Sequence, residues 1–342
     1  MTDPSGDDLG AAVPGERWVI RYRLTDGSAT DLIGWLDAVS PEAVQLTTVD
    51  QQRHAVPRSA IIATRRAPAA QGGPDPRRVS AADLERWALP GWLAIHEPLG
   101  QWTLRAGAGF TGRANACLAV GDPGRPIAQA AARVVAYAEE HGIAPRAQVI
   151  DGSPEEAELR ALGWVDCYVP TDVLAVRLAD FLTDRPAPAG VRVVEELEPS
   201  WWAAYQRSRP NSADPAILRM ILDGQPPRAF ASVDDPGVEN HGVDERDRPV
   251  AIARGHLSAD WLGLTSIWTN PDHRRQGWAT AMMRALGHWA ARRGARYGFL
   301  QVATANTEAI TAYQRLGFVG HHRYLYLTPG AAQTQRTRSV GA

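Results

Sequence analysis

Apolar and polar residues alternate with a period of two across much of residues 15–66. The alternation is clearest at Trp18, Ile20 and Tyr22, and a turn signal centred on Asp26 follows it. A period of two places successive side chains on opposite faces of a strand. Five short runs separated by turn residues predict a small closed β-barrel in this region.

The spacing of these strands resembles that of SH3-like barrels, in which Pro57–Ser59 would form one turn of 3₁₀ helix. Barrels of this class bind peptides or nucleic acids in some proteins and are structural in others. We expect a docking or structural role, which leaves a protein partner at the barrel open. Residues 67–78 form a Pro/Gly linker, and residues 1–14 and 329–342 are expected to be disordered.

The pattern changes to mixed helix and strand in residues 79–185. Ala114–Val120 is expected to form a strand, and apolar residues at helical spacing begin at Ile127. A short buried strand at Gln148–Ile150 and a helix opened by Ser153 come next. These elements predict a second domain with a mixed sheet.

Residues 190–328 predict a third domain, in which strands and helices again alternate. Its centre is the apolar run Trp261–Trp268, which is followed by a turn and then by a helix beginning near Trp278. A second strand–loop–helix unit joins Tyr297–Val302 to Thr307–Leu316. The predicted fold class is therefore α/β (α+β), with a barrel followed by two mixed-sheet domains.

Composition narrows the class of protein. The chain has 342 residues, of which 44% are hydrophobic, and a formal net charge of −2, which suits a globular protein of two or three domains without a nucleic-acid partner. Its two cysteines are too few for a disulfide scaffold and are typical of thiols in a reducing cytoplasm. The acidic, polar start is unlike a signal peptide, and no apolar run is long enough to span a membrane.

The turn after Trp268 has the chemistry of an anion site. A strand, a short loop and a helix in this order leave unpaired N–H groups at the helix start, where the helix dipole is positive. Arg274 and Arg275 add full positive charges, and Gly277 has no Cβ to obstruct a close approach of the backbone. The alternative is a solvated basic turn. The loop and helix around it favour a site for the phosphate of a cofactor.

Two motifs together carry a family resemblance. Residues 274–279 have the form R-x-x-G-x-A, and residues 300–318 read LQVATANTEAITAYQRLGF, with Asn306, Tyr313 and Gly317 at fixed intervals after a strand. In this order and spacing, the pair resembles the GNAT acetyltransferases. The resemblance covers residues 190–328 and implies an enzyme that uses acetyl-CoA.

The resemblance also implies which residues hold this co-substrate. The acetyl and pantetheine end would lie at Ile267, Trp268 and Thr269, with Leu300–Ala303 as the other wall. The pyrophosphate would lie against the loop and helix start. The implied cofactor-binding residues are Ile267, Trp268, Thr269, Arg274, Arg275, Gln276, Gly277, Trp278, Ala279, Thr280 and Asn306.

Tyr313 matches the family's usual general acid, which protonates the leaving CoA thiolate. Its helical spacing from Ala309 and Leu316 is also typical of a core aromatic residue, so that interpretation stays open. A general base is not evident, because the strand Trp261–Trp268 contains no carboxylate. The candidates for the base are a water chain or one of the side chains Asp260, His256, Glu195 and Glu196.

Residues 79–185 resemble a degenerate copy of the same fold. Leu162-Gly163-Trp164 stands where Leu316-Gly317-Phe318 stands in the third domain, but the loop GDPGRP at residues 121–126 lacks R-x-x-G-x-A. We therefore expect a tandem of GNAT-like domains with one working cofactor site. The combination with an SH3-like barrel is similar to a group of actinobacterial GNAT proteins.

The leading hypothesis is an N-acetyltransferase in which a primary amine attacks acetyl-CoA directly and Tyr313 acts as general acid. The alternative is a non-catalytic acyl-CoA-binding regulator or adaptor that recruits a partner through the barrel. Asp272-His273 has no second set of ligands at metal spacing, so no metal is expected. Trp261, Trp268 and Trp278 could together shape a pocket for an apolar acceptor, and a homodimer stays open.

Overall fold

The computed structural model describes residues 9, 12–182, 189–209, 214–235 and 249–330. Several segments discussed above lie outside the described residues. They are most of residues 1–14, the Pro186–Pro188 linker, most of the polar loop at 234–248, and residues 331–342 of the tail. The chain divides into two compact units. The first compact unit contains residues 1–75, 176–204 and 229–298, and the second contains residues 76–175, 205–228 and 299–342.

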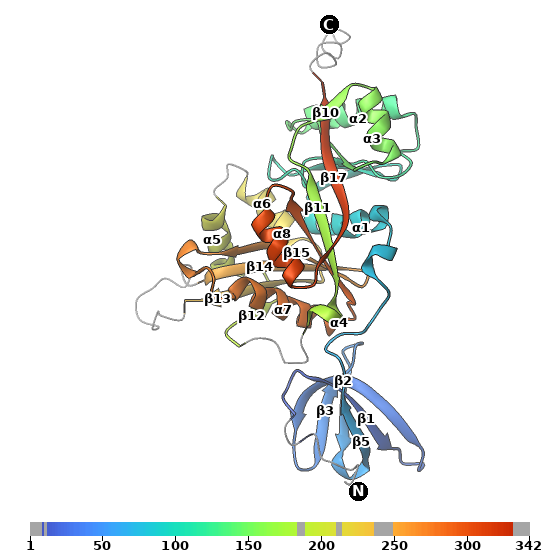
Figure 1. The fold of residues 1–342 in the computed structure, drawn as a ribbon, viewed down its shortest axis with the longest axis vertical. Helices are drawn as coiled ribbons and strands as arrows, with labels where there is room; N and C mark the ends of the chain where they lie inside the picture. Colours follow the sequence, from blue (N-terminus) through green and yellow to red (C-terminus); the bar gives the residue numbers. More distant parts are fainter. Residues whose placement is uncertain (1–8, 10–11, 183–188, 210–213, 236–248, 331–342) are drawn as a thin grey trace. The chain divides into compact units, whose positions relative to one another are not determined.

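The N-terminal part of the first compact unit is a five-stranded antiparallel sheet, drawn in blue in Figure 1. Its strand order is β4-β3-β2-β1-β5, with β4 and β5 at the two edges. A cluster of apolar side chains around Trp18, Ile20, Leu36 and Leu46 forms its core. The strands are β1 (Arg17–Arg23), β2 (Ala29–Val39), β3 (Ala43–Thr47), β4 (Arg53–Pro57) and β5 (Ile61–Arg66), and the predicted 3₁₀ turn is η2 (Arg58–Ala60).

The rest of the first compact unit is a sheet with the order β12-β13-β14-β15 and a helix, α7, packed on β14 and β15. Pairs β12–β13 and β14–β15 are antiparallel. Met282, Leu286 and Ala290 recur along the buried side of α7, as the helical period predicts. The elements are α4 (Leu178–Phe181), β12 (Arg192–Val194), β13 (Arg228–Asp234), β14 (Pro249–Ser258), β15 (Trp261–Thr269), η6 (Pro271–His273) and α7 (Trp278–Ala291).

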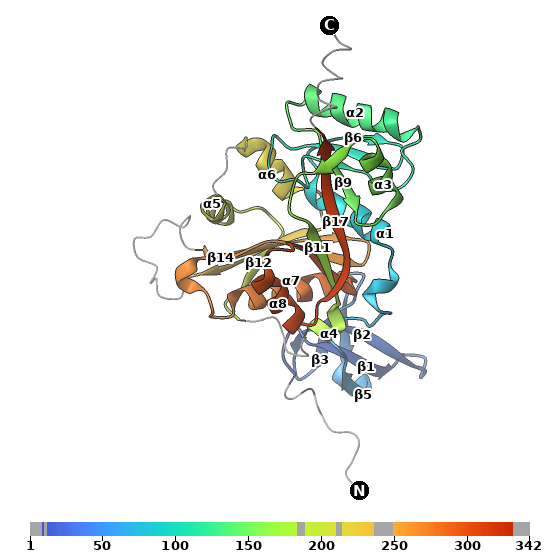
Figure 2. The same ribbon diagram turned by 45° about the horizontal axis from the view of Figure 1, so that its top comes forward.

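The second compact unit contains a mixed sheet with the order β11-β17-β9-β8-β7-β6, in which β8 and β9 are parallel. Figure 2 shows α2 and α3 beside this sheet. The elements at its N-terminal end are η3 (Pro76–Arg78), α1 (Ala81–Ala88), η4 (Leu89–Trp92), β6 (Ile95–Leu99), β7 (Trp102–Ala106) and β8 (Cys117–Leu118). Those that follow are α2 (Ile127–Glu140), β9 (Ala147–Ile150), α3 (Pro154–Ala161), β10 (Trp164–Asp166), β11 (Thr171–Arg177), α6 (Pro215–Asp223), α8 (Thr307–Arg315) and β17 (Val319–Pro329). The division between the units also falls within α5 (Pro199–Ser208) and β16 (Tyr297–Ala303), and near the ends of β11 and β13.

The last strand, β17, belongs with residues 76–175 in this division, although it follows residues 229–298 in the chain. It pairs antiparallel with β9, β10 and β11. Leu325 and Leu327 on β17 pack in the same apolar cluster as Val149 and Leu159. Long-range pairing therefore decides which core the C-terminal strand completes.

The predicted strand Ala114–Val120 is wrong in its length, because only Cys117–Leu118 forms a strand, β8. The fully buried side chain of Asn115 accepts hydrogen bonds from the N–H groups of Gly107 and Gly109 at 2.9 and 3.0 Å. Its amide also donates to the carbonyls of Phe110 and Thr111. Because of these bonds, the start of the predicted strand forms a loop and does not pair with a neighbouring strand.

Candidate functional site

A bulge in β15 shapes the end of the strand before the predicted loop. Arg254 pairs with Thr265 and Ile252 pairs with Trp268, so two residues, Ser266 and Ile267, lie opposite the single residue between them on β14. Ser266 has a φ of 53°, which is in the left-handed region. A bulge bends a strand and turns the residues after it to a new direction.

The turn after β15 is built by local hydrogen bonds. The Asn270 carboxamide accepts from the N–H of Asp272 at 3.2 Å, and Pro271–His273 form one turn of 3₁₀ helix, η6. Arg275 and Gly277 have φ values of 64° and 85°, and Gly277 is the N-cap of α7 without a side-chain cap hydrogen bond. Successive residues in right- and left-handed conformations turn several N–H groups towards one point, which is an anion-binding geometry.

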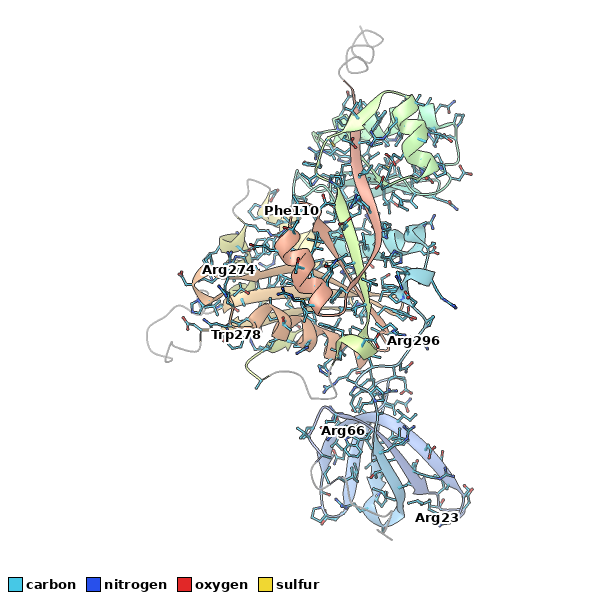
Figure 3. The ribbon with its side chains drawn as sticks, in the orientation of Figure 1. Arg23, Arg66, Phe110, Arg274, Trp278 and Arg296 are labelled. Carbon is cyan, nitrogen blue, oxygen red and sulfur yellow. The ribbon has the colours of Figure 1, made fainter. Side chains whose placement is uncertain are left out.

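A pocket of about 410 Å³ opens at this turn. Gly277 adjoins open space, because no heavy atom lies within 4 Å of the position that a Cβ would take. Figure 3 labels Arg274, which lies within the turn, and Trp278, the first residue of α7. The pocket is lined by Ile267, Trp268, Thr269, His273, Arg274, Arg275, Gly277, Trp278, Ala279 and Thr280.

Nine of the predicted cofactor-binding residues line this pocket. Gln276 does not line the pocket; its carboxamide accepts a hydrogen bond from Trp278 Nε1 at 3.1 Å. Asn306 belongs to the second compact unit, where it caps α8 by accepting from the N–H of Ala309 at 3.2 Å. His273 lines the pocket and was missed, although it directly precedes the R-x-x-G-x-A motif. Its Nε2 lies 3.4 Å from the Asp235 carboxylate.

The electrostatics of this pocket favour a negatively charged ligand. The N-terminus of α7 carries the positive end of the helix dipole, and Arg274 and Arg275 are both exposed beside it. Arg274 Nε also donates to the Thr269 carbonyl at 3.4 Å, which ties the loop to the end of β15. Backbone donors, dipole and guanidinium groups therefore act together at one side of the pocket.

Tyr313, the predicted general acid, lies on α8 in the second compact unit. Its ring is partly buried and lies 6.1 Å from that of Phe318, so it also contributes to packing. Burial raises the pKa of its phenol, and the nearby Arg209 lowers it to a lesser extent. The phenol is therefore protonated at neutral pH, as a proton donor must be.

The candidates for a general base are engaged elsewhere or lie at the far end of β15. His256 is 2% exposed, its ring packs against Gly263, and burial followed by the charge of Arg254 lowers its pKa to about 3. The Glu195 carboxylate accepts from Trp289 and Arg293. Asp260 precedes β15, whereas the pocket lies at the opposite end of that strand. Glu196 is exposed after β12.

Trp261 does not belong to the predicted aromatic pocket. Its side chain is fully buried and stacks on Tyr297 with the ring centroids 4.6 Å apart. Trp268 and Trp278 do line the pocket. In the described ranges, no three His, Cys, Asp or Glu side chains are grouped so that they could hold a metal ion. None of the helices in the described part of the chain is long and apolar enough to cross a membrane.

The corresponding loop of residues 79–185 is filled by its own side chains. The N–H of Gly121 donates to the Glu155 carboxylate at 2.7 Å, and the N–H of Gly124 donates to that of Asp122 at 2.8 Å. The N–H of Asp122 donates to the Gln101 carboxamide at 2.9 Å. These backbone donors therefore already have acceptors, two of them negatively charged.

Comparison with known proteins gives this geometry a family. The model of the family described as "Probable histone acetyltransferase Rv0428c C-terminal" matches residues 80–327. The chain belongs to this acetyltransferase family. It is an acetyltransferase enzyme of the GNAT superfamily, whose members use acetyl-CoA.

Individual relatives are distant. An uncharacterized N-acetyltransferase, YobR, of Bacillus subtilis is 23% identical over 70% of this chain and 96% of its own length. Streptothricin acetyltransferase of Streptomyces lavendulae is 30% identical over 31% of this chain and 59% of its own length. A GCN5-related N-acetyltransferase from Kribbella flavida shares the fold with a TM-score of 0.52 at 19% identity, over 75% of this chain and 98% of its own.

Proposed function

We propose that the protein is an N-acetyltransferase that transfers the acetyl group of acetyl-CoA to a primary amine by direct attack. The observation that carries the proposal is the open pocket between the end of β15 and the start of α7. It combines backbone donors, the positive end of a helix and two arginines at a turn that Gly277 leaves unobstructed. This combination suits the pyrophosphate of acetyl-CoA.

The proposed orientation of acetyl-CoA follows from the order of these elements. The pyrophosphate contacts the N–H groups of Arg275–Thr280, with Arg274 and Arg275 beside it. The pantetheine arm runs along Ile267–Thr269, where the bulge at Ser266 turns the strand. Leu300–Ala303 form the other wall, and Asn306 contacts the CoA arm.

The chemical step requires a proton at the sulfur. The amine nitrogen attacks the thioester carbonyl, the C–N bond forms and the C–S bond breaks. The departing CoA thiolate takes its proton from the Tyr313 phenol, which regains one from solvent. Since β15 carries no carboxylate, water takes one proton from the ammonium before the amine attacks and a second from the nitrogen of the tetrahedral intermediate, and positioning of the amine supplies much of the rate.

The N-terminal sheet of residues 17–66 is proposed to act as an SH3-like docking module for a protein partner. Support comes from its five strands and from the 3₁₀ turn between β4 and β5. We place the protein in the cytoplasm, and leave open whether it is a homodimer. The matched family is named for histone, and two relatives are named for streptothricin and for ribosomal-protein alanine; these names support an amine as the acceptor.

Calorimetry with acetyl-CoA, followed by thiol release across a panel of amines, tests the proposal. We expect Tyr313→Phe to lower kcat by about 100-fold or more while the acetyl-CoA affinity stays unchanged, because general acid catalysis typically contributes 10²–10⁴-fold. Acetyl-CoA binding without turnover on any amine would favour a non-catalytic regulator. Failure to bind acetyl-CoA at all would overturn both functions.

A further inference from the structure

The second compact unit contains a cluster of buried charged groups outside the proposed acetyl-CoA pocket. Arg105 on β7 is 3% exposed; its Nε donates to the Ala116 carbonyl at 2.7 Å and its Nη2 to the Gln148 carboxamide at 2.8 Å. Glu85 on α1 is also 3% exposed and accepts from Gln148 at 2.6 Å. Its second oxygen lies 2.9 Å from His322 Nε2. Both carboxylate oxygens of Glu85 are therefore used.

Arg113 brings a second guanidinium to the same cluster. Its Cζ lies 4.5 Å from the centroid of the Trp92 ring, which is an attractive cation–π geometry. Its Nη1 donates to Gln301 Oε1 at 3.1 Å and lies 3.5 Å from the Tyr324 hydroxyl. Both contacts leave from the same nitrogen. The Nε/Nη2 edge, which can hold a carboxylate by two parallel hydrogen bonds, has no partner within the described ranges.

The balance of charge in this cluster is positive. Glu85 is the carboxylate that acts electrostatically on both Arg105 and Arg113, and no acidic side chain that the structure describes lies within ion-pair distance of Arg113. Burial lowers the pKa of Arg113, but Tyr324, Tyr326 and Glu85 together outweigh it and raise that pKa, so the guanidinium stays charged and can attract an anion. Two of the other arginines that lie over aromatic rings do have carboxylate partners. Arg133 has Glu97 and Glu140 at 2.9 and 2.8 Å, and Arg66 has Glu16 at 3.0 Å.

An unpaired donor lies next to Arg113. Trp92 is 4% exposed, and its indole N–H has no hydrogen-bond partner among the residues that the structure describes. A buried donor without an acceptor destabilises a fold by about 1–3 kcal/mol, so such a group needs a reason. An oxyanion bound beside the Arg113 guanidinium would supply the missing acceptor for the Trp92 indole N–H.

The loop that carries Arg113 is held in an uncommon conformation. Ala108 and Thr111 have φ values of 48° and 55°, in the left-handed region that non-glycine residues rarely adopt. The buried Asn115 carboxamide stabilises this loop through the bonds described above, and Phe110 packs edge-on against Tyr205 at 6.3 Å. Backbone strain of this kind persists where surrounding groups enforce it, often at a functional site.

We propose that Arg113, with Trp92 and Gln301, binds the carboxylate of the amine acceptor. The Nε/Nη2 edge of Arg113 holds both carboxylate oxygens, and the indole N–H of Trp92 donates to one of them. Gln301 orients the guanidinium from β16 by accepting a hydrogen bond from Nη1. The acceptor class is therefore an amino acid or another amine with a carboxylate. This inference rests on the proposed function.

The first test measures binding of benzoate, a simple carboxylate, to the full chain by calorimetry without CoA. Because a bidentate pair between charged groups is lost, Arg113→Gln should weaken benzoate binding by about 10-fold or more. Trp92→Phe keeps the ring and removes the N–H, so it should weaken binding by about 3-fold. Arg133→Gln, the control, removes a guanidinium that already has carboxylate partners and should change nothing.

The second test measures thiol release from acetyl-CoA with pairs of amines that differ only in the carboxylate, such as phenylalanine and phenethylamine. The native chain should prefer the carboxylate-bearing member by about 10-fold in kcat/KM, and Arg113→Gln should abolish the preference. Ethanolamine and O-phosphoethanolamine form a further pair, which distinguishes a phosphate from a carboxylate.

Each outcome decides between the two ideas. Normal acetyl-CoA binding, with benzoate binding absent or equal in the native chain and Arg113→Gln, overturns this inference and leaves the proposed function standing. If the native chain does not bind acetyl-CoA, the proposed function is overturned instead. If Arg113→Gln fails to fold, Trp92→Phe and Arg113→Lys carry the test. Arg113→Lys keeps the positive charge but loses the two parallel N–H donors of the guanidinium, so it should bind benzoate about 3- to 10-fold more weakly.

Discussion

The loop between β15 and α7 and the loop between β8 and α2 hold the same place in two strand–loop–helix units. Gly121 and Gly124 in the second loop donate to Glu155 and Asp122, so carboxylates of the chain itself occupy the amides. The first loop instead borders an open pocket at Gly277. The difference teaches that the fold alone does not make an anion site. A site requires N–H groups that the chain leaves without an acceptor.

The largest effect is expected when both loops are blocked in the same way. In Gly277→Glu a carboxylate enters the proposed pyrophosphate position, so acetyl-CoA affinity should fall about 100-fold or more through repulsion and lost approach. Gly124→Glu is the matched control, because its φ of 70° imposes a strain similar to that at 85° in Gly277. Calorimetry on both variants checks this, and equal losses of affinity would contradict the assignment of the site.

A substitution at Arg275 distinguishes the contribution of the guanidinium charge to acetyl-CoA binding from that of the backbone conformation. Arg275→Gly keeps the left-handed turn, which glycine adopts freely, and removes one guanidinium. Acetyl-CoA affinity should fall about 5- to 10-fold at low salt, and by less at high salt because of screening. Arg125→Gly in the other loop should leave the affinity unchanged. A loss in Arg275→Gly that does not depend on salt would indicate a change of backbone instead.

The strands paired with β15 and β8, which are β14 and β7, should respond differently to acid. His256 on β14 has its pKa lowered by burial to about 3, so the folded state binds fewer protons than the unfolded state between pH 6.5 and pH 3. Stability is therefore present above pH 6.5 and decreases as the pH falls, by about 1 kcal/mol between pH 6 and pH 5. Arg105 on β7 stays charged throughout and adds no such slope.

Denaturant unfolding of the native chain and of His256→Gln across this pH range measures the contribution. The native chain should lose more stability on acidification than the variant does. Identical pH profiles would show that His256 is not responsible for the acid sensitivity.

The smallest effect is expected in the loop that is already filled. Glu155→Gln keeps an acceptor for the N–H of Gly121 but removes the charge, so the free energy of unfolding should fall by about 0.5–1 kcal/mol. Chemical denaturation measures this, with Glu158→Gln on the exposed side of α3 as control. One acetyl-CoA should still bind per chain. A second acetyl-CoA bound per chain would mean that the Glu155 carboxylate alone prevents the loop between β8 and α2 from binding it.

Much of the fold could be predicted from local pattern. The five N-terminal strands, the strand at residues 261–269 and the helix beginning at Trp278 were predicted from apolar residues that recur along each segment, and these elements are present in the structure. The strand at residues 114–120 was predicted too long. Asn115 is fully buried there and hydrogen-bonds to the loop instead of continuing the ladder. Periodicity cannot reveal such a competing set of bonds.

The candidate site shows the same division. Gly277 and the two arginines could be recognised from sequence, since their chemistry depends on neighbours within one loop. His273 was missed because its partner, Asp235, follows a different strand. The sequence leaves His256 open as a candidate general base, but folding buries its ring against Gly263 and lowers its pKa. A side chain's proton affinity depends on surroundings that only packing supplies.

The sequence by itself determined the elements of the protein and the family to which they belong, because hydrophobic period, turn residues and a short motif are all local properties. Only the tertiary structure decided that β17 completes the core around Val149 and Leu159, and that Arg113 meets Trp92 and Gln301. It also decided which of two similar loops keeps its pocket open. These outcomes depend on contacts between residues far apart in the chain, and local preferences do not specify such contacts.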